Sequence, residues 1–274
     1  MPLATAHGWA PSVITNAGIV GTTTPGTTLV SNATTLLDGA VTECITAANN
    51  IRDSWGISIG IDAIGAGATA SESAVDILVG GATDDVLISA LLVGGPATAG
   101  FRWFFFPLYI PSGLRIAALL ASVRTSISAG CIIELHGGGV PPWRTGSRVT
   151  TYGTQINNAR GLAVVPTASG GASSITEMTA STTEDHFAFL PGFQCSTDTT
   201  MGASVLNIAI AVGATVEERI GTWWFGNDAS ETQTGPNPPW CVFRDVPSGT
   251  RLTMLASNSS TNDAAYDGLI YAVS

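Results

Sequence analysis

Apolar residues recur at every second position along much of this chain, which is the period of β-strands. In residues 75–79, the apolar side chains Val75, Ile77 and Val79 follow this spacing, and residues 205–210 repeat the pattern. Such runs are short and separated by Gly and Pro turns. The pattern predicts an all-β fold of antiparallel β-sandwich, jelly-roll-like domains. A weak helical pattern over residues 36–48 is the exception.

Two sequence motifs each occur twice. Pro-Ser-Gly-x-Arg stands at residues 111–115 and again at 247–251, an offset of 247 − 111 = 136. Gly-Ala-Thr stands at residues 81–83 and again at 213–215, an offset of 213 − 81 = 132. Proline and glycine at these positions are typical of tight turns that lead into strands. Two colinear motif pairs indicate an internal duplication.

The remaining matches fix how the two copies are organised. The smaller offset also relates Asp-Ser-Trp at 53–55 to Asp-His-Phe at 185–187, and we expect the longer loop at 226–238 to absorb the difference in offset. In the last strands we match Ile133 and Leu135 to Leu269 and Tyr271. The predicted organisation is an N-terminal arm (1–26), a first β-sandwich domain (27–136), a Gly/Pro linker (137–149) and a second β-sandwich domain (150–274).

The composition narrows the possible partners. Charged residues make up only 11% of the 274-residue chain, the formal net charge is −10, and no lysine is present. An acidic chain gains little from releasing phosphate counterions, so nucleic acid is not an expected partner. The first 21 residues lack a basic, continuously apolar leader, and residues 101–123 contain charges and prolines. We therefore expect neither a signal peptide nor membrane insertion.

The residue types that can bind metals or act as catalysts form no recognisable cluster in the sequence. Cys44, Cys131, Cys195 and Cys241 have no CxxC spacing and do not match one another across the repeat, so we expect free, mostly buried thiols, although oxidation of a pair stays open. The three histidines, His7, His136 and His186, lie far apart in the sequence. We expect no cofactor and no metal.

Acidic pairs recur at one turn of both copies. Asp84-Asp85 in the first copy has a counterpart in Glu217-Glu218 in the second. Calcium needs six to eight oxygen ligands, and no Asp-x-Asp-x-Asp-Gly string supplies them. We therefore expect these carboxylates to be solvated turn residues.

Two short motifs imitate a serine hydrolase. Residues 56–60 fit G-x-S-x-G around Ser58, and His136 begins an HGGG string. In α/β-hydrolases, however, HGGG precedes the serine motif, whereas here it follows. The repeat also has Leu190 in place of Ser58. We therefore interpret residues 56–60 as an ordinary strand and expect no enzymatic activity.

Aromatic clusters are the best candidates for a contact surface. Strands that carry large rings on both faces cannot bury all of them in one sandwich core, so the second face must meet a neighbouring domain, a subunit or a sugar. The candidate interface residues are Trp103, Phe105, Trp143, Trp223, Trp224 and Trp240.

The order of elements in each copy carries a resemblance. Each copy has a Gly-Ala-Thr turn, an aromatic strand, a Pro-Ser-Gly-x-Arg turn, a Leu-Ala-Ser turn and a final apolar strand. In the first copy these are residues 81–83, 103–106, 110–116, 120–122 and 132–135; in the second they are 213–215, 240–243, 246–252, 255–257 and 269–273. The pattern resembles a family of tailed-phage virion proteins built of tandem β-sandwich domains. The resemblance implies a structural role in the virion and supplies no catalytic residues.

The predicted function is therefore that of a non-enzymatic bacteriophage structural protein, tail-associated, located in the virion and assembled in the host cytoplasm. Its expected partners are further copies of itself and other virion proteins. Two alternatives stay open: a capsid decoration or head-spike protein, and a carbohydrate-binding host-adhesion module whose partner is a host surface glycan.

Overall fold

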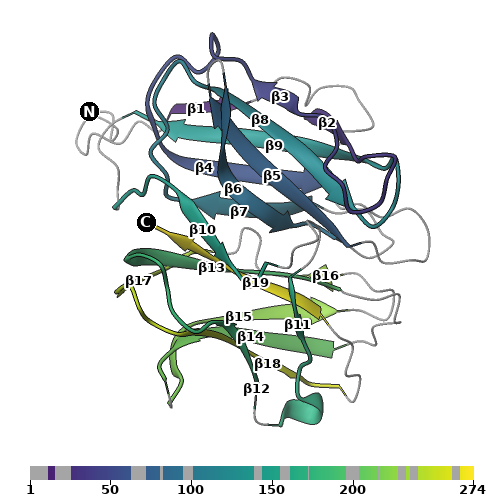
Figure 1. Ribbon diagram of the computed structural model, residues 1–274, viewed down its shortest axis with the longest axis vertical. Helices are drawn as coiled ribbons and strands as arrows, with labels where there is room; N and C mark the ends of the chain where they lie inside the picture. The colour runs from purple at the N-terminus through teal and green to yellow at the C-terminus, as the bar shows by residue number, and fades with distance from the viewer. Residues whose placement is uncertain are drawn as a thin grey trace, which may run out of the picture.

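The structure is a computed structural model that describes residues 12–15, 26–62, 72–80, 83–94, 101–138, 144–154, 161–171, 173–195, 204–214, 216–227, 233–234, 240–260 and 266–274. Over these residues the chain is all-β, and its one helical element is the 3-10 turn η1 (Ala168–Gly170). Figure 1 shows two β-sandwiches stacked along the long axis of the molecule. The predicted fold class is confirmed.

Two antiparallel sheets form the first sandwich. Sheet A has the strand order β1 (Ser12–Thr15), β9 (Ser128–Gly137), β4 (Ser54–Asp62) and β7 (Phe101–Phe106), and β2 (Thr27–Val30) also pairs with β9. Sheet B has the order β3 (Thr42–Ile45), β8 (Arg115–Ser122), β5 (Ser73–Gly80) and β6 (Asp84–Leu92). Apolar residues at alternate positions of these strands are buried between the two sheets.

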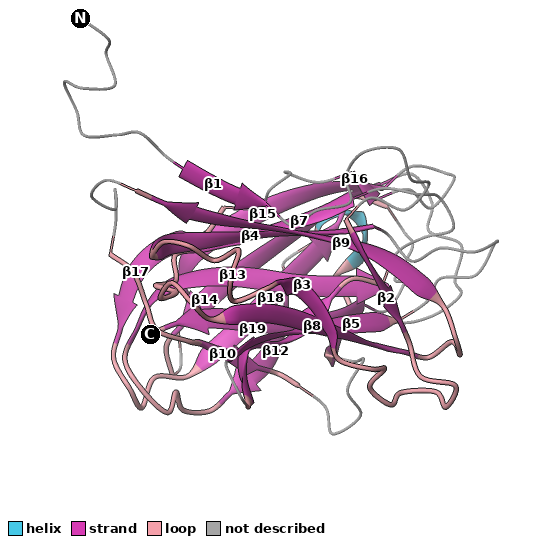
Figure 2. Cartoon of the chain, turned by 90° about the horizontal axis from the view of Figure 1, so that it is seen from above, coloured by secondary structure: helices cyan, strands magenta, loops and turns pink. Residues whose placement is uncertain are grey.

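Two further antiparallel sheets form the second sandwich. Sheet C has the order β10 (Val149–Tyr152), β19 (Tyr266–Val273), β13 (His186–Cys195) and β17 (Val242–Val246), and β11 (Leu162–Val164) also pairs with β19. Sheet D has the order β12 (Ser174–Thr179), β18 (Leu252–Asn258), β14 (Ser204–Val212), β15 (Glu218–Asn227) and β16 (Gln233–Thr234). Figure 2 shows the layered arrangement of the strands from above.

The two sandwiches have the same strand order. In chain order, β1 to β6 correspond to β10 to β15, and β7, β8 and β9 correspond to β17, β18 and β19. With this match the order β1-β9-β4-β7 becomes β10-β19-β13-β17, and β3-β8-β5-β6 becomes β12-β18-β14-β15. The additional strand β16 lies in the longer loop of the second copy. The repeated turn motifs therefore predicted a repeated topology correctly.

The last strand of each copy differs by one residue from the match made on the sequence. Ile57 pairs with Leu135, and its counterpart Phe189 pairs with Ala272, so Leu135 corresponds to Ala272 and not to Tyr271. The connection between β18 and β19 contains the extra residue. Because a slip of one residue turns every side chain of a strand to the other face, Tyr271 points away from the core of its own sandwich.

The two repeated motifs meet at one turn in each copy. The carboxylate of Asp53 accepts a hydrogen bond from the backbone N–H of Ser112 at 2.9 Å, and Asp185 accepts one from Ser248 at 2.8 Å. The glycine that follows each serine has a positive φ, 78° at Gly113 and 82° at Gly249. The offset of 132 thus relates the two aspartates, and the offset of 136 relates the two serines that they bind.

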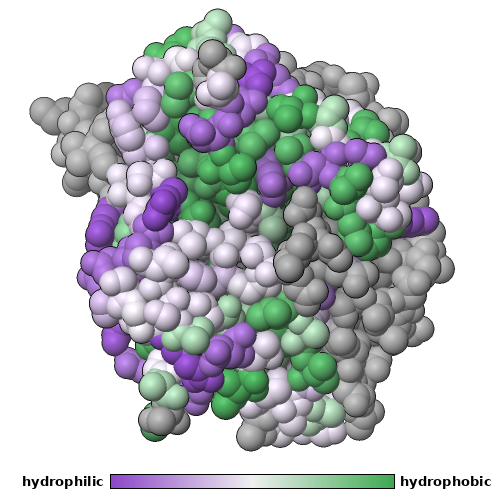
Figure 3. Space-filling model, viewed as in Figure 1, coloured by the Kyte–Doolittle hydropathy of each residue, from purple (hydrophilic) through white to green (hydrophobic). Residues whose placement is uncertain are grey.

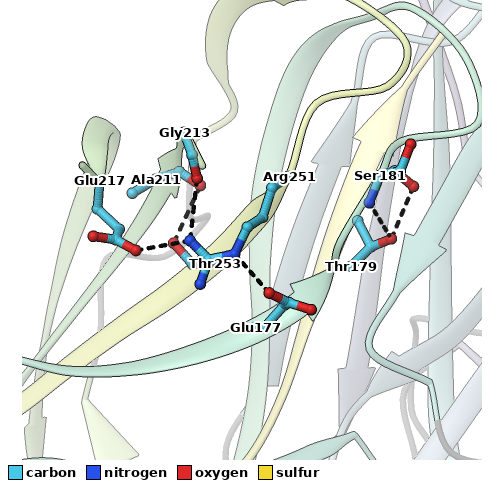
Figure 4. A network of polar contacts seen from close by, with 8 residues as sticks. All are labelled: Glu177, Thr179, Ser181, Ala211, Gly213, Glu217, Arg251 and Thr253. Carbon is cyan, nitrogen blue, oxygen red and sulfur yellow. Dashed lines mark hydrogen bonds and ion pairs between the residues drawn. The ribbon is translucent and has the colours of Figure 1, made fainter. Parts of the chain in front are cut away.

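The arginine of each turn motif reaches the acidic turn of its copy. Arg115 donates hydrogen bonds to both carboxylate oxygens of Asp84, and Arg251 donates to Glu217 at 2.8 Å. Figure 4 shows that Arg251 also contacts Glu177 and the carbonyl oxygen of Gly213. The interpretation of the acidic pairs as merely solvated was therefore wrong for one carboxylate of each pair, because the turn arginine neutralises it.

The weak helical pattern at residues 36–48 was misleading. The segment contains strand β3 and no helix, because Leu36 adopts a positive φ of 65° and β-branched residues follow it. Strand β1 lies within the segment expected to be an arm and pairs with β9. No helix among the described residues is long and apolar enough to span a membrane.

Three cysteines are free and buried: Cys44, Cys131 and Cys241. The thiol of Cys131 interacts with Cys44, and this hydrogen bond together with burial raises the pKa of Cys131. The side chain of Cys195 lies outside the described residues.

Candidate contact surfaces

The outer face of sheet C covers the open side of the first sandwich, between the edge strands β6 and β7 (Figure 1). The side chains that meet there belong to one apolar cluster that is continuous with the core of the first sandwich. The second sandwich contributes Val149, Phe187, Ala188, Leu190, Cys241, Leu269, Tyr271 and Val273. Opposite them lie Leu92, Phe104 and Phe106 of the edge strands. The two sandwiches therefore share an apolar interface.

Tyr271 is the central polar contact of this interface. Its hydroxyl accepts a hydrogen bond from the backbone N–H of Leu92 at 2.8 Å and donates one to the carbonyl oxygen of Ala90 at 2.9 Å. The rings of Phe104 and Phe106 contact its ring edge-on, with centroids 6.3 and 5.8 Å away. Burial raises the pKa of Tyr271 well above its ordinary value, so the phenol stays neutral.

Further polar groups satisfy backbone atoms at the margin of the interface. The side-chain oxygen of Gln194 accepts hydrogen bonds from the backbone N–H groups of Ser73 at 3.1 Å and Gly94 at 2.9 Å. Arg102 donates to the carbonyl oxygen of Phe193 at 2.9 Å. These contacts cap strand ends of one sandwich with side chains of the other, which favours a fixed relative orientation.

The outer face of sheet A is the counterpart of the outer face of sheet C. Trp103 and Phe105 of β7 are half-buried on this face. A Cβ atom at Gly60 would lie 2.9 Å from the ring of Trp103, and one at Gly56 would lie 2.9 Å from the ring of Phe105. The two glycines of β4 therefore let both rings lie against the sheet.

A serine and a histidine meet on the same face. Ser58 Oγ and His136 Nε2 are 2.7 Å apart, so the structure brings together the two residues that imitate a hydrolase motif. Burial lowers the pKa of His136, and the negative charge of Glu134 partly opposes this shift. The rings of Trp55 and Phe105 have centroids within 5.9 and 5.8 Å of the imidazole. In the described part of the chain, no carboxylate hydrogen-bonds to His136 as the acid of a catalytic triad would.

The edge formed by β15 and β17 carries the most exposed tryptophans of the described residues. Trp224 on β15 is 62% exposed, and Trp240, two residues before β17, is 59% exposed. Phe243 on β17 is also exposed. We call this surface the β15–β17 edge. It corresponds to the β6–β7 side of the first sandwich.

Trp223 has a different role from its neighbour. It is 1% exposed and lies in the core of the second sandwich, where its indole N–H donates to the carbonyl oxygen of Trp240 at 3.1 Å. Trp223 is therefore unavailable to a partner in this fold, because strand alternation directs it inward and directs Trp224 outward. Trp143 and His7 lie outside the described residues.

Sheet B presents a third apolar surface on the first sandwich. Leu78 and Ala117 are buried on its outer face, Leu119 is half-buried, and Val86 is exposed. Figure 3 shows apolar side chains gathered over these strands, flanked by polar ones.

Histidine His186 is a structural residue. Its Nε2 lies 2.8 Å from the hydroxyl of Tyr152, and burial lowers its pKa. No group of three or more His, Cys, Asp or Glu side chains among the described residues is placed to hold a metal ion.

Sequence reasoning missed the residues that join the two sandwiches, above all Tyr271, Gln194 and Leu92. It did indicate that rings on both faces of a strand require a neighbouring domain or subunit. The alternation of Phe104 and Phe106 with Phe105 was the available signal. Which side chains of β19 meet the neighbouring sandwich depends on the one extra residue that precedes this strand in the second copy.

No protein-family model matches this chain, and a comparison with curated proteins found no match either.

Solved structures with similar folds have low sequence identity to this chain. A PNGF-II structure has a TM-score of 0.36 and 8% identity, covering 96% of this chain, and the chain spans 65% of the length of that protein. A chain of the cowpea mosaic virus top component, naturally occurring empty particles, has a TM-score of 0.40 and 9% identity, covering 93% of this chain and 91% of that one. The tandem CBM22-1–CBM22-2 domain of Paenibacillus barcinonensis Xyn10C has a TM-score of 0.32 and 10% identity, covering 97% and 98%. Similarities at this level carry no argument about function.

Proposed function

We propose that this protein is a non-enzymatic structural component of a bacteriophage virion, tail-associated, which assembles through protein–protein contacts. The observation that carries the assembly role is the β15–β17 edge. Trp224 and Trp240 leave more than half of their surface exposed there. Exposed tryptophans are typical of sites where a partner excludes water.

The weakly charged surface supports the same role. With 11% charged residues and no lysine, few side chains must lose hydration when two copies meet. Acidic net charge also disfavours packing against nucleic acid. The assignment to a phage tail rests on the sequence resemblance described above.

Analytical ultracentrifugation of the purified chain at low and high ionic strength tests the assembly role. We expect self-association at micromolar concentration that changes little with salt, because the proposed contact is apolar. A monomer under both conditions would leave docking onto a different virion protein as the proposal. Gold-labelled antibody on negatively stained virions then distinguishes a tail location from a capsid decoration or head-spike location.

A second candidate function, carbohydrate binding, is favoured by one observation. Trp103 and Phe105 lie against glycines on the outer face of sheet A, next to the polar side chains of Ser58, Glu134 and His136. Rings that stack on a sugar and polar groups that bond its hydroxyls are the two requirements of glycan recognition. A glycan array tests this candidate, and Trp103→Ala should abolish any signal that depends on this face.

A further inference from the structure

We infer that the β15–β17 edge of one copy binds the outer face of sheet A in a second copy of this chain. The inference rests on the proposed function and identifies the partner and both contact surfaces. Its basis is that the molecule already contains one contact of this type. The outer face of sheet C covers the β6–β7 side of the first sandwich, and the duplication supplies a second face and a second edge.

The first residue correspondence follows from the registers of sheets B and D. Ala74 pairs with Leu92 and with Ala121. Asn207 pairs with Trp224 and with Ser257, which stands at the motif offset of 136 from Ala121. Trp224 therefore occupies the position of Leu92.

The second correspondence follows from β7 and β17. Phe106 pairs with Ile57, and Val242 pairs with Phe189, the counterpart of Ile57. Trp240 stands two residues before Val242, as Phe104 stands two residues before Phe106. Trp240 therefore occupies the position of Phe104.

The two sets of positions differ sharply in exposure. Leu92 is 0% exposed and Phe104 is 5% exposed. Tyr271 of sheet C hydrogen-bonds to the backbone of Leu92 and packs edge-on against the ring of Phe104. Their counterparts Trp224 and Trp240 are 62% and 59% exposed. The second copy thus carries exposed tryptophans at two positions that are buried in the first copy, next to its contact with sheet C. Tryptophan is the residue most enriched at the energetic centres of interfaces.

The outer face of sheet A is the surface that corresponds to the covering face of sheet C. The half-buried rings of Trp103 and Phe105 supply its apolar part. Ile132, which occupies the position of Leu269, is already buried. Glu134 occupies the position of Tyr271 and keeps an acceptor for an N–H group. Its centre is more polar than that of sheet C, as suits a contact between separate chains.

Both tryptophans are exposed although strand β16 pairs with the outer side of β15. It pairs with Gly226 and Asn227, so it extends sheet D beyond Trp224 along β15. The contact joins two different surfaces, and each copy that binds presents a further unused edge. Repetition of such a contact generates a closed ring or an open filament.

Sedimentation velocity with two complementary variants of the full chain tests the inference. An edge variant carries Trp224→Ala and Trp240→Ala, and a face variant carries Glu134→Arg. We expect the wild-type chain to self-associate and each variant alone to sediment as a monomer, with a dissociation constant raised at least about 30-fold. A mixture of the two variants should form a dimer and nothing larger, because one intact edge and one intact face remain. Val216→Ser, at an exposed apolar position of sheet D's turn, is the matched control and should associate like wild type.

Three results would overturn the inference: undiminished association of the edge variant, no heterodimer in the mixture of correctly folded variants, or a monomeric wild-type chain. Circular dichroism and thermal unfolding verify that both variants are folded. The proposed virion role has its own test in the antibody labelling of particles. A labelled virion with a monomeric chain would therefore refute this contact and leave the proposed function standing.

Discussion

Tyr271 and Leu92 are hydrogen-bonded at 2.8 Å although 179 residues separate them in the chain. The phenol hydroxyl of the second sandwich thereby completes the backbone of strand β6 in the first. Because the same hydroxyl also donates to Ala90, it satisfies both a donor and an acceptor in a fully buried region. Together with the contacts of Gln194 and Arg102, this contact helps to fix the relative position of the two sandwiches.

Tyr271→Phe should lower the free energy of unfolding by about 1–3 kcal/mol, because it leaves a buried N–H and a buried carbonyl without this partner. Equilibrium unfolding in urea measures the loss. Tyr109→Phe is the control, since its exposed hydroxyl donates to Asp53 at 2.9 Å and its loss should cost about 0.5 kcal/mol or less. Equal effects of the two substitutions would contradict a special role for Tyr271.

Gly113→Val and Gly249→Val should each destabilise the protein by about 1–3 kcal/mol. Both glycines have a positive φ, and a Cβ atom at either position would meet nothing within 4 Å. The cost therefore comes from the backbone conformation and not from a clash. Gly113→Asn and Gly249→Asn should cost less, because asparagine tolerates the left-handed region. Thermal unfolding compares the four variants, and no difference between valine and asparagine would refute the argument.

The pairing of Asp84 with Arg115 should make stability depend on pH in the acid range. The hydrogen bond from Arg115 holds the pKa of Asp84 below its ordinary value. As the pH falls, the Asp84 carboxylate therefore becomes protonated at a higher pH in the unfolded chain than in the folded chain. The stabilisation is complete above the unfolded pKa of about 3.9 and is lost as the pH falls toward the folded pKa. Asp84→Asn should flatten the fall of the melting temperature between about pH 6 and about pH 3; parallel curves would show that the pair contributes nothing.

The imidazole of His136 should titrate below the ordinary pKa of about 6.5. Burial favours the neutral imidazole, so as the pH falls the unfolded chain is protonated at a higher pH than the folded chain. The free energy of unfolding therefore decreases as the pH falls below the ordinary pKa of about 6.5. An NMR titration of the histidine ring protons measures the pKa, with His136→Gln as the assignment control. A pKa above the ordinary value would contradict burial as the dominant cause.

The contact between Ser58 and His136 should not make a nucleophile. In the described structure the two residues lie on a sheet face among aromatic rings and without an acid on the imidazole. A fluorophosphonate probe should therefore leave Ser58 unmodified. Mass spectrometry reads the result, and a Ser58 adduct absent from the Ser58→Ala variant would show that the chain has a reactive serine.

The turn residues explain how much of this fold could be predicted from sequence. Proline, glycine and the capping aspartates Asp53 and Asp185 fix backbone geometry locally, so their recurrence predicted the same topology in both halves. Alternating apolar residues predicted strands for the same reason. The segment at residues 36–48 misled because a helical period of apolar residues says nothing about the positive φ at Leu36.

The contact surfaces were less predictable. The alternation of residues 103–106 shows that rings point both ways, but it does not show which face a neighbour covers. That depends on one extra residue before β19, which turns Tyr271 outward, and a match by turn motifs does not detect it. Of the candidate interface residues, Trp223 is buried in its own sandwich, while Trp224, one position along the strand, is exposed.

The central position of β9 in sheet A and of β19 in sheet C determines the order in which the chain can fold during synthesis. Sheet A joins β4 to β9, so the first sandwich cannot close before residue 137 has left the ribosome. Its open side lacks the contacts of Tyr271 with Leu92 and Phe104 until β19 has been made. A ribosome-bound chain thus carries an apolar edge through the synthesis of its entire second half, and such an edge is a site where nascent chains associate wrongly.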